Sequence, residues 1–185
     1  MTEEYFDIIK SDGTETHTTA SRTEVHKKGL WHKTTHVWII RKHNNRTQVL
    51  LQKRALTKDS FPGQYDISSA GHVITNETPC ITAIRELEEE LGLFIEPDDL
   101  TYIGQFTHNY KGTFHNKPFI DNEHTYVYVY QNDIDTQKLK LQSEEISSVK
   151  WFDVTTVRNC IENQHDNICI DTETFAILLQ YIKHS

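Results

Sequence analysis

The segment between residues 71 and 93 constrains the fold and the chemistry of this chain more than any other part of the sequence. It reads GHVITNETPCITAIRELEEELGL and places charged residues at fixed intervals between two glycines. The specified positions of the pattern are Gly71, Glu77, Arg85, Glu86, Leu87, Glu89, Glu90, Gly92 and Leu93. This spacing predicts a short loop followed by one amphipathic helix that carries a cluster of carboxylates.

Residues at both ends of this segment define where the helix begins and ends. Thr78 or Asn76 can cap the first turn with a side-chain oxygen, and Pro79 suits that turn because it has no N–H to satisfy. Gly92 is typical of the left-handed residue that follows a helix. We expect the apolar face of the helix to pack on a sheet, and it consists of Cys80, Ile84, Leu87 and Leu91.

Three carboxylates, those of Glu86, Glu89 and Glu90, fall within one turn on another face of the helix. Like charges at these spacings each destabilise a helix by roughly a few tenths of a kcal/mol, and only Arg85 is placed to offset them. A charged run of this kind is commonly a solvated helix face. Its register with the earlier residues of the pattern instead favours a cation site, and hard oxygen ligands suit Mg²⁺, with Mn²⁺ as an alternative.

The complete pattern resembles the Nudix box, G-x5-E-x7-R-E-U-x-E-E-x-G-U with U aliphatic, at every specified position. The resemblance implies an α/β fold, an α/β/α sandwich with a mixed sheet, and metal-assisted chemistry on a small-molecule diphosphate. The carbonyl of Gly71 would join the three glutamates as a metal ligand, and Arg85 would orient one of them. Glu77 has two interpretations, a metal ligand or an anchor that holds the loop through Arg85, of which the second is favoured.

Length, charge and cysteine content exclude several classes of protein. The chain has 185 residues, so we expect a single domain over residues 1–185. A formal net charge of −8 argues against a nucleic acid polymer as partner. Its three cysteines show no metal-ligand spacing, which favours a reducing cytoplasm. No signal-like or membrane-spanning apolar run occurs, so no membrane partner is expected, whereas a homodimer stays open.

Apolar alternation and turn residues divide the rest of the chain into further elements. Residues 1–33 form a lead-in with a short strand, an Asp-Gly turn and a partly helical stretch. We expect strands at 35–41, 47–54, 66–74, 100–110, 124–132 and 149–154, and helices at 154–163 and 171–184. The span 111–123 is expected to be a loop or an irregular hairpin. The alternation of Tyr126, Tyr128 and Tyr130 suggests a strand with one core face and one outward face.

A second stretch, LLQKRALTKDSFPGQYDISSAGHV at residues 50–73, resembles the isopentenyl-diphosphate isomerases, which share the Nudix fold. The positions in common are Arg54, Ala55, Leu56, Lys58, Pro62, Gly63, Gly71 and His72. Weaker similarity extends upstream to TEVHKKGLWH and downstream to IDNEHTYVYVY. This resemblance adds a second set of candidate site residues outside the box.

In the isomerases, residues that match Arg54 and Lys58 bind the substrate diphosphate. Residues that match His32, His72, Asp121 and Glu123, with His26 one position out of register, lie in a metal and acid site. Each residue also has a simpler interpretation: the two cations as surface charges, the histidines as structural residues, and the two acids as an exposed turn. His72 could be a metal ligand or a hydrogen-bond donor in the substrate site.

One departure from the isomerase pattern separates the possible activities. The isomerases place a proton-transferring Cys before the Gly-His pair, where this chain has Ala70. The glutamates of the box are complete, so we expect an Mg²⁺-dependent pyrophosphohydrolase that acts on a nucleoside-diphosphate-type substrate. Glu89 or Glu123 would be the general base, and Glu144 or Glu145 ranks below Glu123. An isomerase and a non-catalytic nucleotide-binding sensor are the alternatives.

Overall fold

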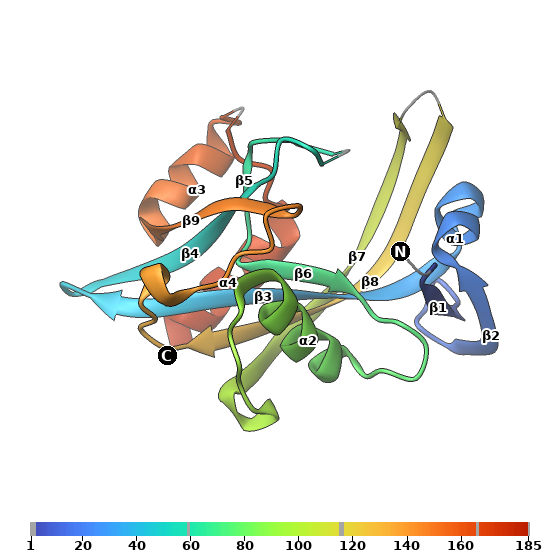
Figure 1. Cartoon of the computed structure of the whole chain (residues 1–185), viewed down its shortest axis with the longest axis horizontal. Coiled ribbons are helices and arrows are strands. Elements are labelled where there is room, and N and C mark those ends of the chain that lie inside the picture. Colours follow the sequence, from blue (N-terminus) through green and yellow to red (C-terminus); the bar gives the residue numbers. More distant parts are fainter. Residues whose placement is uncertain (1–2, 59, 115–116, 166, 185) are drawn as a thin grey trace.

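A nine-stranded mixed sheet passes through the molecule, with helices on both of its faces (Figure 1). The computed structural model describes residues 3–58, 60–114, 117–165 and 167–184. The strands are β1 (Tyr5–Ile9), β2 (Glu15–Ser21), β3 (Trp31–His43), β4 (Arg46–Arg54), β5 (Tyr65–Asp66), β6 (Ser69–His72), β7 (Leu100–Phe114), β8 (Lys117–Gln131) and β9 (Ile146–Asp153). The helices are α1 (Arg22–Lys28), α2 (Pro79–Leu91), α3 (Val154–Glu162) and α4 (Thr172–His184), and η1 (Pro97–Asp99) and η2 (Thr136–Lys138) are short 3₁₀ turns.

The long strand β3 organises the sheet because it pairs with four other strands. It runs antiparallel to β4 and parallel to β8, while β6 pairs with its first half and β1 with its start. The outer strands pair with these neighbours of β3: β5 and β9 pair with β4, and β7 pairs with β8. The combination of parallel and antiparallel pairs confirms the mixed sheet.

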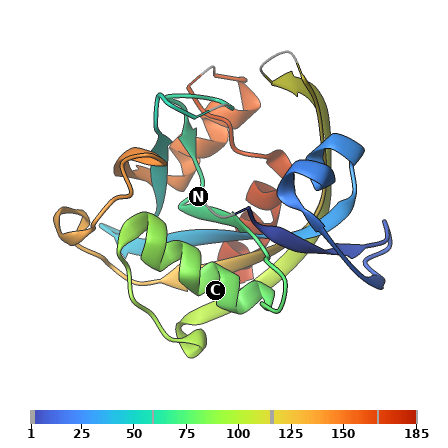
Figure 2. The ribbon, with the colours of Figure 1, turned by 45° about the vertical axis from the view of Figure 1, so that its right-hand side comes forward.

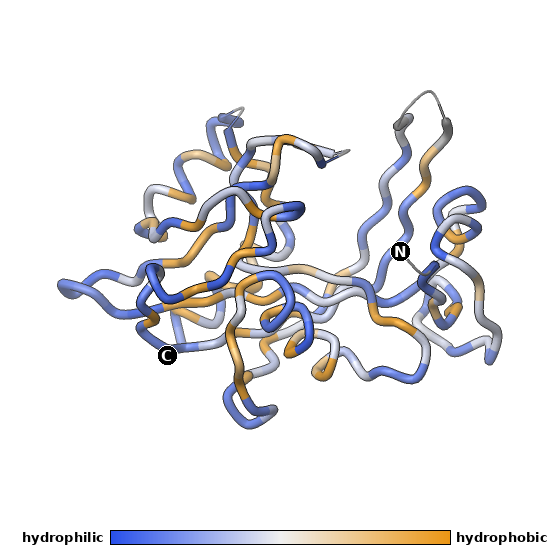
Figure 3. Tube along the Cα trace, in the orientation of Figure 1, coloured by the Kyte–Doolittle hydropathy of each residue, from blue (hydrophilic) through white to orange (hydrophobic). Residues whose placement is uncertain are grey.

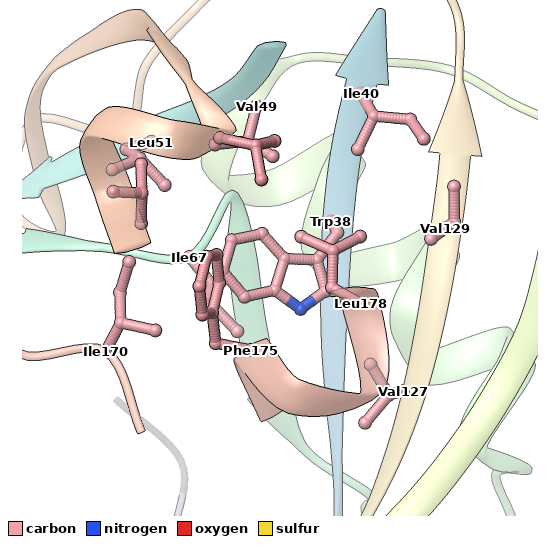
Figure 4. Packing of buried hydrophobic residues seen from close by; sticks show 12 residues of the cluster. Trp38, Ile40, Val49, Leu51, Ile67, Val127, Val129, Ile170, Phe175 and Leu178 are labelled. Atoms are coloured by element: carbon pink, nitrogen blue, oxygen red, sulfur yellow. The ribbon is translucent and has the colours of Figure 1, made fainter. Parts of the chain in front are cut away.

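Alternating residues of β3 supply the two halves of the core. Val37 and Ile39 pack with Leu87 on the face that α2 covers. Trp38 and its neighbours pack on the opposite face against α3 and α4, and Figure 4 shows the Trp38 ring among side chains of β4, β8 and α4. Figure 2 separates α2 from α3 and α4 across the central strands, and apolar positions gather between the layers in Figure 3. The predicted α/β/α sandwich is confirmed.

The box helix begins and ends where the sequence predicts. Thr78, and not Asn76, is the cap: its hydroxyl accepts a hydrogen bond from the backbone N–H of Ile81. Gly92 follows the helix at φ 64°, a left-handed conformation that glycine adopts without steric cost. Leu87 and Leu91 are fully buried, whereas Cys80 and Ile84 are partly buried at the edge of the same face.

The strand with alternating tyrosines does not have the outward face that the sequence suggested. Tyr128 and Tyr130 are buried with the α2 side of the core, while Val127 and Val129 are buried on the α4 side. The prediction was wrong because β8 lies beside β3 in the middle of the sheet, where helices cover both faces. The tyrosines therefore belong to a core face of the sheet, and only their hydroxyl groups are polar.

Of the two predicted alternatives for the span 111–123, the structure shows the hairpin and not the loop. Strands β7 and β8 continue as an antiparallel hairpin, with Tyr110 opposite Asp121 and His108 opposite Glu123. Residues 115–116, which lie between these strands, are outside the described residues. The polar composition left a loop open because the end of this hairpin projects beyond α2, α3 and α4, with only α1 beside β8 (Figure 1). The two acids therefore project from a strand, which fixes their direction more firmly than a loop would.

The N-terminal lead-in is also more regular than predicted. The polar sequence ETHTTAS forms β2, a strand that no apolar alternation indicated and that pairs with β1. Helix α1 occupies only Arg22–Lys28, and β3 begins at Trp31. The expected strand at 66–74 is divided between β5 and β6. No helix in the described ranges combines the length and the apolar composition that a membrane span requires.

Candidate active site

The carboxylates of the box lie against β6, and one glycine makes this contact possible. A Cβ atom on Gly71 would overlap the carboxylate of Glu86. Glycine is required here because a larger residue would not fit. Its backbone conformation is not the reason, because Gly71 is not in the left-handed region. The close approach brings the backbone of β6 within reach of the same cation that Glu86 could hold.

Arg85 ties the carboxylates of this region together. Its Nη1 atom donates to Glu86 at 2.8 Å and to Glu89 at 3.0 Å, and its Nη2 donates to the carbonyl of His72 at 3.3 Å. Its Nε lies 3.2 Å from both carboxylate oxygens of Glu77. Glu77 also accepts a hydrogen bond from the Thr82 hydroxyl at 2.7 Å. Because both of its oxygens are engaged, the geometry of Glu77 is that of a loop anchor.

Glu90 is buried and Glu86 is largely shielded, with 14% of its side chain exposed, and the loss of solvent governs the proton affinity of both carboxylates. Desolvation raises the pKa of Glu86 to about 7 even though Arg85 opposes the shift, and it raises the pKa of Glu90 to about 8. The Oε2 atom of Glu90 has no hydrogen-bond partner among the described residues. A buried carboxylate without a partner is costly, and a divalent cation would satisfy it. Glu89 differs, because 54% of its side chain is exposed.

A second cluster of possible ligands lies on the other side of β6. It combines His26 of α1, His32 of β3, His72 of β6 and Asp121 of β8, whose candidate ligand atoms all lie within 4.8 Å of one another. The Nε2 atoms of the three histidines and Oδ1 of Asp121 are buried and have no hydrogen-bond partner in the described part of the chain. Four buried, unpartnered atoms that converge on one point fit a metal ion.

Hydrogen bonds to the backbone orient two of these imidazole rings. The Nδ1 atom of His26 lies 2.9 Å from the carbonyl of Arg22, and that of His32 lies 3.0 Å from the carbonyl of Leu30. A carbonyl only accepts, so Nδ1 carries the proton and the neutral ring presents the Nε2 lone pair to the cluster. Burial lowers the pKa of His32, which favours this neutral form. A hydrogen bond from the ring nitrogen that faces away from the metal is typical of metal-binding histidines.

His72 is held in a different way. Its Nδ1 faces an Arg22 nitrogen at 3.4 Å, and burial places its pKa well below the ordinary value. The fully buried ring of Phe6 stacks on His72 at 4.8 Å and on His32 at 5.3 Å between centroids. Phe6 was not singled out from the sequence, where it is one more apolar residue of the first strand.

Glu123 borders the histidine cluster. Its Oε1 atom lies 3.8 Å from Nε2 of His72 and 3.9 Å from Nε2 of His32, and its Oε2 accepts a hydrogen bond from Thr34 at 3.2 Å. Burial raises the pKa of Glu123, and the neighbouring carboxylate of Asp121 raises it further. This position suits either a ligand or a proton-transferring acid.

The two cations expected to hold phosphate are engaged with the protein itself. Arg54 donates from Nε and Nη2 to Ser60 and from Nη1 to Asp66, at 2.9–3.1 Å. Lys58 forms an ion pair with Glu145. Glu145, a lower-ranked candidate base in the sequence, is therefore the partner of Lys58. A phosphate-binding role for either cation stays a prediction and would require these pairs to be shared or broken.

The carboxylate cluster and the histidine cluster are linked through the dipeptide Gly71–His72. Successive residues of a strand face opposite sides, so Gly71 faces α2 and Glu86 while the side chain of His72 enters the histidine cluster. Ala70, where the isomerases have Cys, packs partly buried against the α4 side of the core. The geometry thus describes two candidate cation sites back to back across β6, one built from carboxylates and one rich in imidazole.

Comparison with known proteins identifies the class. The family model described as NUDIX domain matches residues 32–170. An uncharacterized Nudix hydrolase of Clostridium acetobutylicum is 34% identical over 148 residues, which cover 80% of this chain and 69% of that protein. Nudix hydrolase 3 of Arabidopsis thaliana is 39% identical over 166 residues, or 89% of this chain, but the match spans only 21% of the plant protein.

The chain therefore belongs to the Nudix family. It is a hydrolase of the class that acts on phosphorus-containing anhydrides. The resemblance to isomerases is also found, because isopentenyl-diphosphate Delta-isomerase 2 of Photorhabdus laumondii is 29% identical over 147 residues, 80% of this chain and 76% of that protein.

The crystal structure of DR0079 from Deinococcus radiodurans shares the fold, with a TM-score of 0.70. The two chains are 16% identical, and the match covers 94% of this chain and 97% of the other. At this identity the likeness concerns the fold alone.

Substitution of Gly71 tests the close approach of β6 to the box helix. We expect Gly71→Ala to destabilise the protein by about 1–3 kcal/mol, because the added methyl group overlaps the Glu86 carboxylate. Urea unfolding of Gly71→Ala, Glu86→Ala and the double variant measures the coupling. The double variant should recover most of the stability that Gly71→Ala loses relative to wild type. Strictly additive effects would contradict the contact.

Proposed function

We propose that this protein is an Mg²⁺-dependent pyrophosphohydrolase that cleaves the diphosphate linkage of a nucleoside-diphosphate-type substrate. The observation that carries the proposal is the arrangement of two shielded carboxylates on α2: Glu86 lies against Gly71, and the buried Glu90 has an Oε2 atom without a partner in the described part of the chain. Such a donor set fits a hard divalent cation. A cytoplasmic location suits the three free cysteines.

Each residue of the box has a proposed part in the reaction. Glu86, Glu89, Glu90 and the carbonyl of Gly71 would hold Mg²⁺, which, once bound, offsets charge on phosphate oxygens and makes a water molecule more acidic. Arg85 keeps Glu86 and Glu89 in position through its hydrogen bonds. Glu89 is the more exposed of these carboxylates and is the proposed base, with Glu123 as the second candidate.

The histidine cluster is proposed to hold a second cation of a different kind. Three neutral imidazoles with one carboxylate suit a transition-metal ion better than Mg²⁺, which prefers oxygen ligands. The isomerase relative and the resemblance of the sequence support this assignment. Isomerase activity itself is disfavoured because Ala70 cannot transfer a proton.

Amide substitutions of the box test the catalytic assignment. We expect Glu89→Gln and Glu90→Gln each to lower kcat by about 10²-fold or more, because each removes a charged group that stabilises the transition state. Phosphate and nucleotide release should be measured with Mg²⁺ on a panel of nucleoside diphosphates, sugar nucleotides and dinucleotides. Glu88→Gln is the matched control, since Glu88 is exposed on the same helix. Near-normal turnover by both variants would overturn the assignment.

The same panel, extended with isopentenyl diphosphate, distinguishes the competing functions. Conversion of isopentenyl diphosphate without phosphate release would establish the isomerase. Binding of nucleotides without turnover would establish the sensor. Either result replaces the hydrolase.

Affinity for Mg²⁺ should depend on pH because burial raises the pKa of Glu90 to about 8. Below that pH the metal-free carboxyl holds a proton that Mg²⁺ must displace, so affinity should rise by up to about tenfold per pH unit from pH 6 to 8 and then level off. Calorimetry in buffers of different ionisation enthalpy would detect the released proton. Glu90→Gln should remove this dependence between pH 7 and 8 and leave the part below pH 7 that Glu86 contributes, whereas Glu88→Gln should change neither part. An affinity independent of pH in wild type would contradict the model of a protonated buried ligand.

Cobalt binding tests the histidine cluster independently of catalysis. We expect Co²⁺ added to the metal-free protein to give visible d–d absorption from imidazole ligation, which Mg²⁺ should not displace. His32→Gln should abolish most of this absorption, whereas His43→Gln, a substitution of an exposed histidine at the far end of β3, should leave it unchanged. Equal spectra for His32→Gln and wild type would exclude the cluster as the binding site.

A further inference from the structure

A histidine–aspartate pair, His108 with Asp171, joins two distant parts of the chain beside the candidate site. The Nδ1 atom of His108, on β7, lies 2.7 Å from Oδ2 of Asp171, the residue just before α4. Neither residue belongs to the box or to the segments that resemble the isomerases. The sequence offers no signal for the pair, since 62 intervening residues separate it.

The register of the hairpin places His108 on the face of the sheet that carries the histidine cluster. His108 is directly opposite Glu123 in the antiparallel pair of β7 and β8. Directly opposite side chains project to the same face, with Cβ atoms roughly 4.5–5.5 Å apart. Glu123 contacts Thr34 and His32 on this face, so His108 stands next to the border of the cluster.

The contact with Asp171 leaves one ring nitrogen of His108 for a ligand. Nδ1 is bound, so Nε2 points away from Asp171, and Nε2 has no hydrogen bond to any described residue. The side chain is 37% exposed, and the carboxylate partner is 20% exposed. Asp171 fixes the orientation of the His108 ring, and Nε2 is accessible. The ring is therefore suited to bind a hydrogen-bond acceptor through Nε2.

The electrostatic setting favours a charged imidazole. The hydrogen bond to Asp171 raises the pKa of His108, with smaller contributions from Glu123 and Asp121. Burial alone would raise the pKa of Asp171, but hydrogen bonds with His108 and Glu173 together outweigh the effect of burial and lower that pKa. His36, nearby on β3, is the opposite case, because burial lowers its pKa to about 4. The raised pKa of His108 favours the form of the ring in which Nε2 also carries a proton that it can donate.

The two cations predicted to bind phosphate, Arg54 and Lys58, are paired with other residues, so a phosphate-binding role is open to another residue. Arg54 uses its donors on Ser60 and Asp66, and Lys58 is paired with Glu145. We propose that Nε2 of His108, positioned by Asp171, donates a hydrogen bond to a phosphate oxygen of the diphosphate substrate. This inference rests on the proposed function, and it adds a substrate-binding residue outside the Nudix box.

Replacement of His108 by asparagine separates binding from a structural role. The amide nitrogen of Asn lies near the position of Nδ1 and can keep the bond to Asp171, whereas nothing replaces Nε2. Binding of methylenediphosphonate, a non-hydrolysable diphosphate, would be measured by calorimetry with Mg²⁺ present. We expect His108→Asn to weaken this binding at least about tenfold, since a hydrogen bond to a charged group is lost. Affinity for Mg²⁺ alone and the unfolding midpoint should stay unchanged, and His43→Asn should behave as wild type.

His108→Gln provides a second variant in case His108→Asn does not fold. Its amide reaches the position of Nε2 but loses the contact with Asp171, so diphosphonate affinity should fall less than in His108→Asn. In steady-state assays the loss should appear mainly as a raised KM. Unaltered diphosphonate affinity in a folded His108 variant would overturn the inference, and it would leave the hydrolase assignment standing if wild type still cleaves a diphosphate of the panel. Absence of cleavage by wild type would overturn the hydrolase assignment alone.

Discussion

The close approach of Gly71 to Glu86 is the contact on which the rest of the site depends. It sets the distance between α2 and β6, and Arg85 then fills the adjoining space with hydrogen bonds to Glu86 and to the carbonyl of His72. A side chain at residue 71 would separate the helix from the strand. Because His72 follows directly, the same contact also fixes where one imidazole enters the cluster on the opposite face.

Burial of acidic groups is the feature that connects this geometry with function. Glu86, Glu90 and Glu123 all have pKa values raised chiefly by desolvation. One oxygen of Glu90, one oxygen of Asp121 and the Nε2 atoms of the three clustered histidines lack partners among the described residues. Such an arrangement lowers the stability of the metal-free protein, because a buried carboxylate must either stay charged without solvent or take up a proton, and both reduce the free energy of unfolding. Cations that bind there would recover that free energy, so metal binding and folding stability are coupled.

Local signals predicted the parts of the fold that depend on neighbours in sequence. The cap at Thr78, the end at Gly92 and the buried face with Leu87 follow from residues within one helix. Strand β2 was missed, and the sequence left the β7–β8 hairpin at 111–123 as one of two alternatives, because these polar sequences become strands only by pairing. The prediction that the tyrosine strand β8 has an outward face was wrong for the same reason. Whether both faces of a strand are covered depends on its neighbours in the sheet.

For this protein, the sequence alone determined the family, the box helix and the residues that can bind cations, because each depends on spacing within a short segment. Only the tertiary structure decided which of those residues converge. His26, His32, His72 and Asp121 meet through four different elements, and Arg54 and Lys58 are engaged by partners far along the chain. The pair of His108 and Asp171 has no sequence signal. Such contacts depend on how strands and helices pack, which no local pattern encodes.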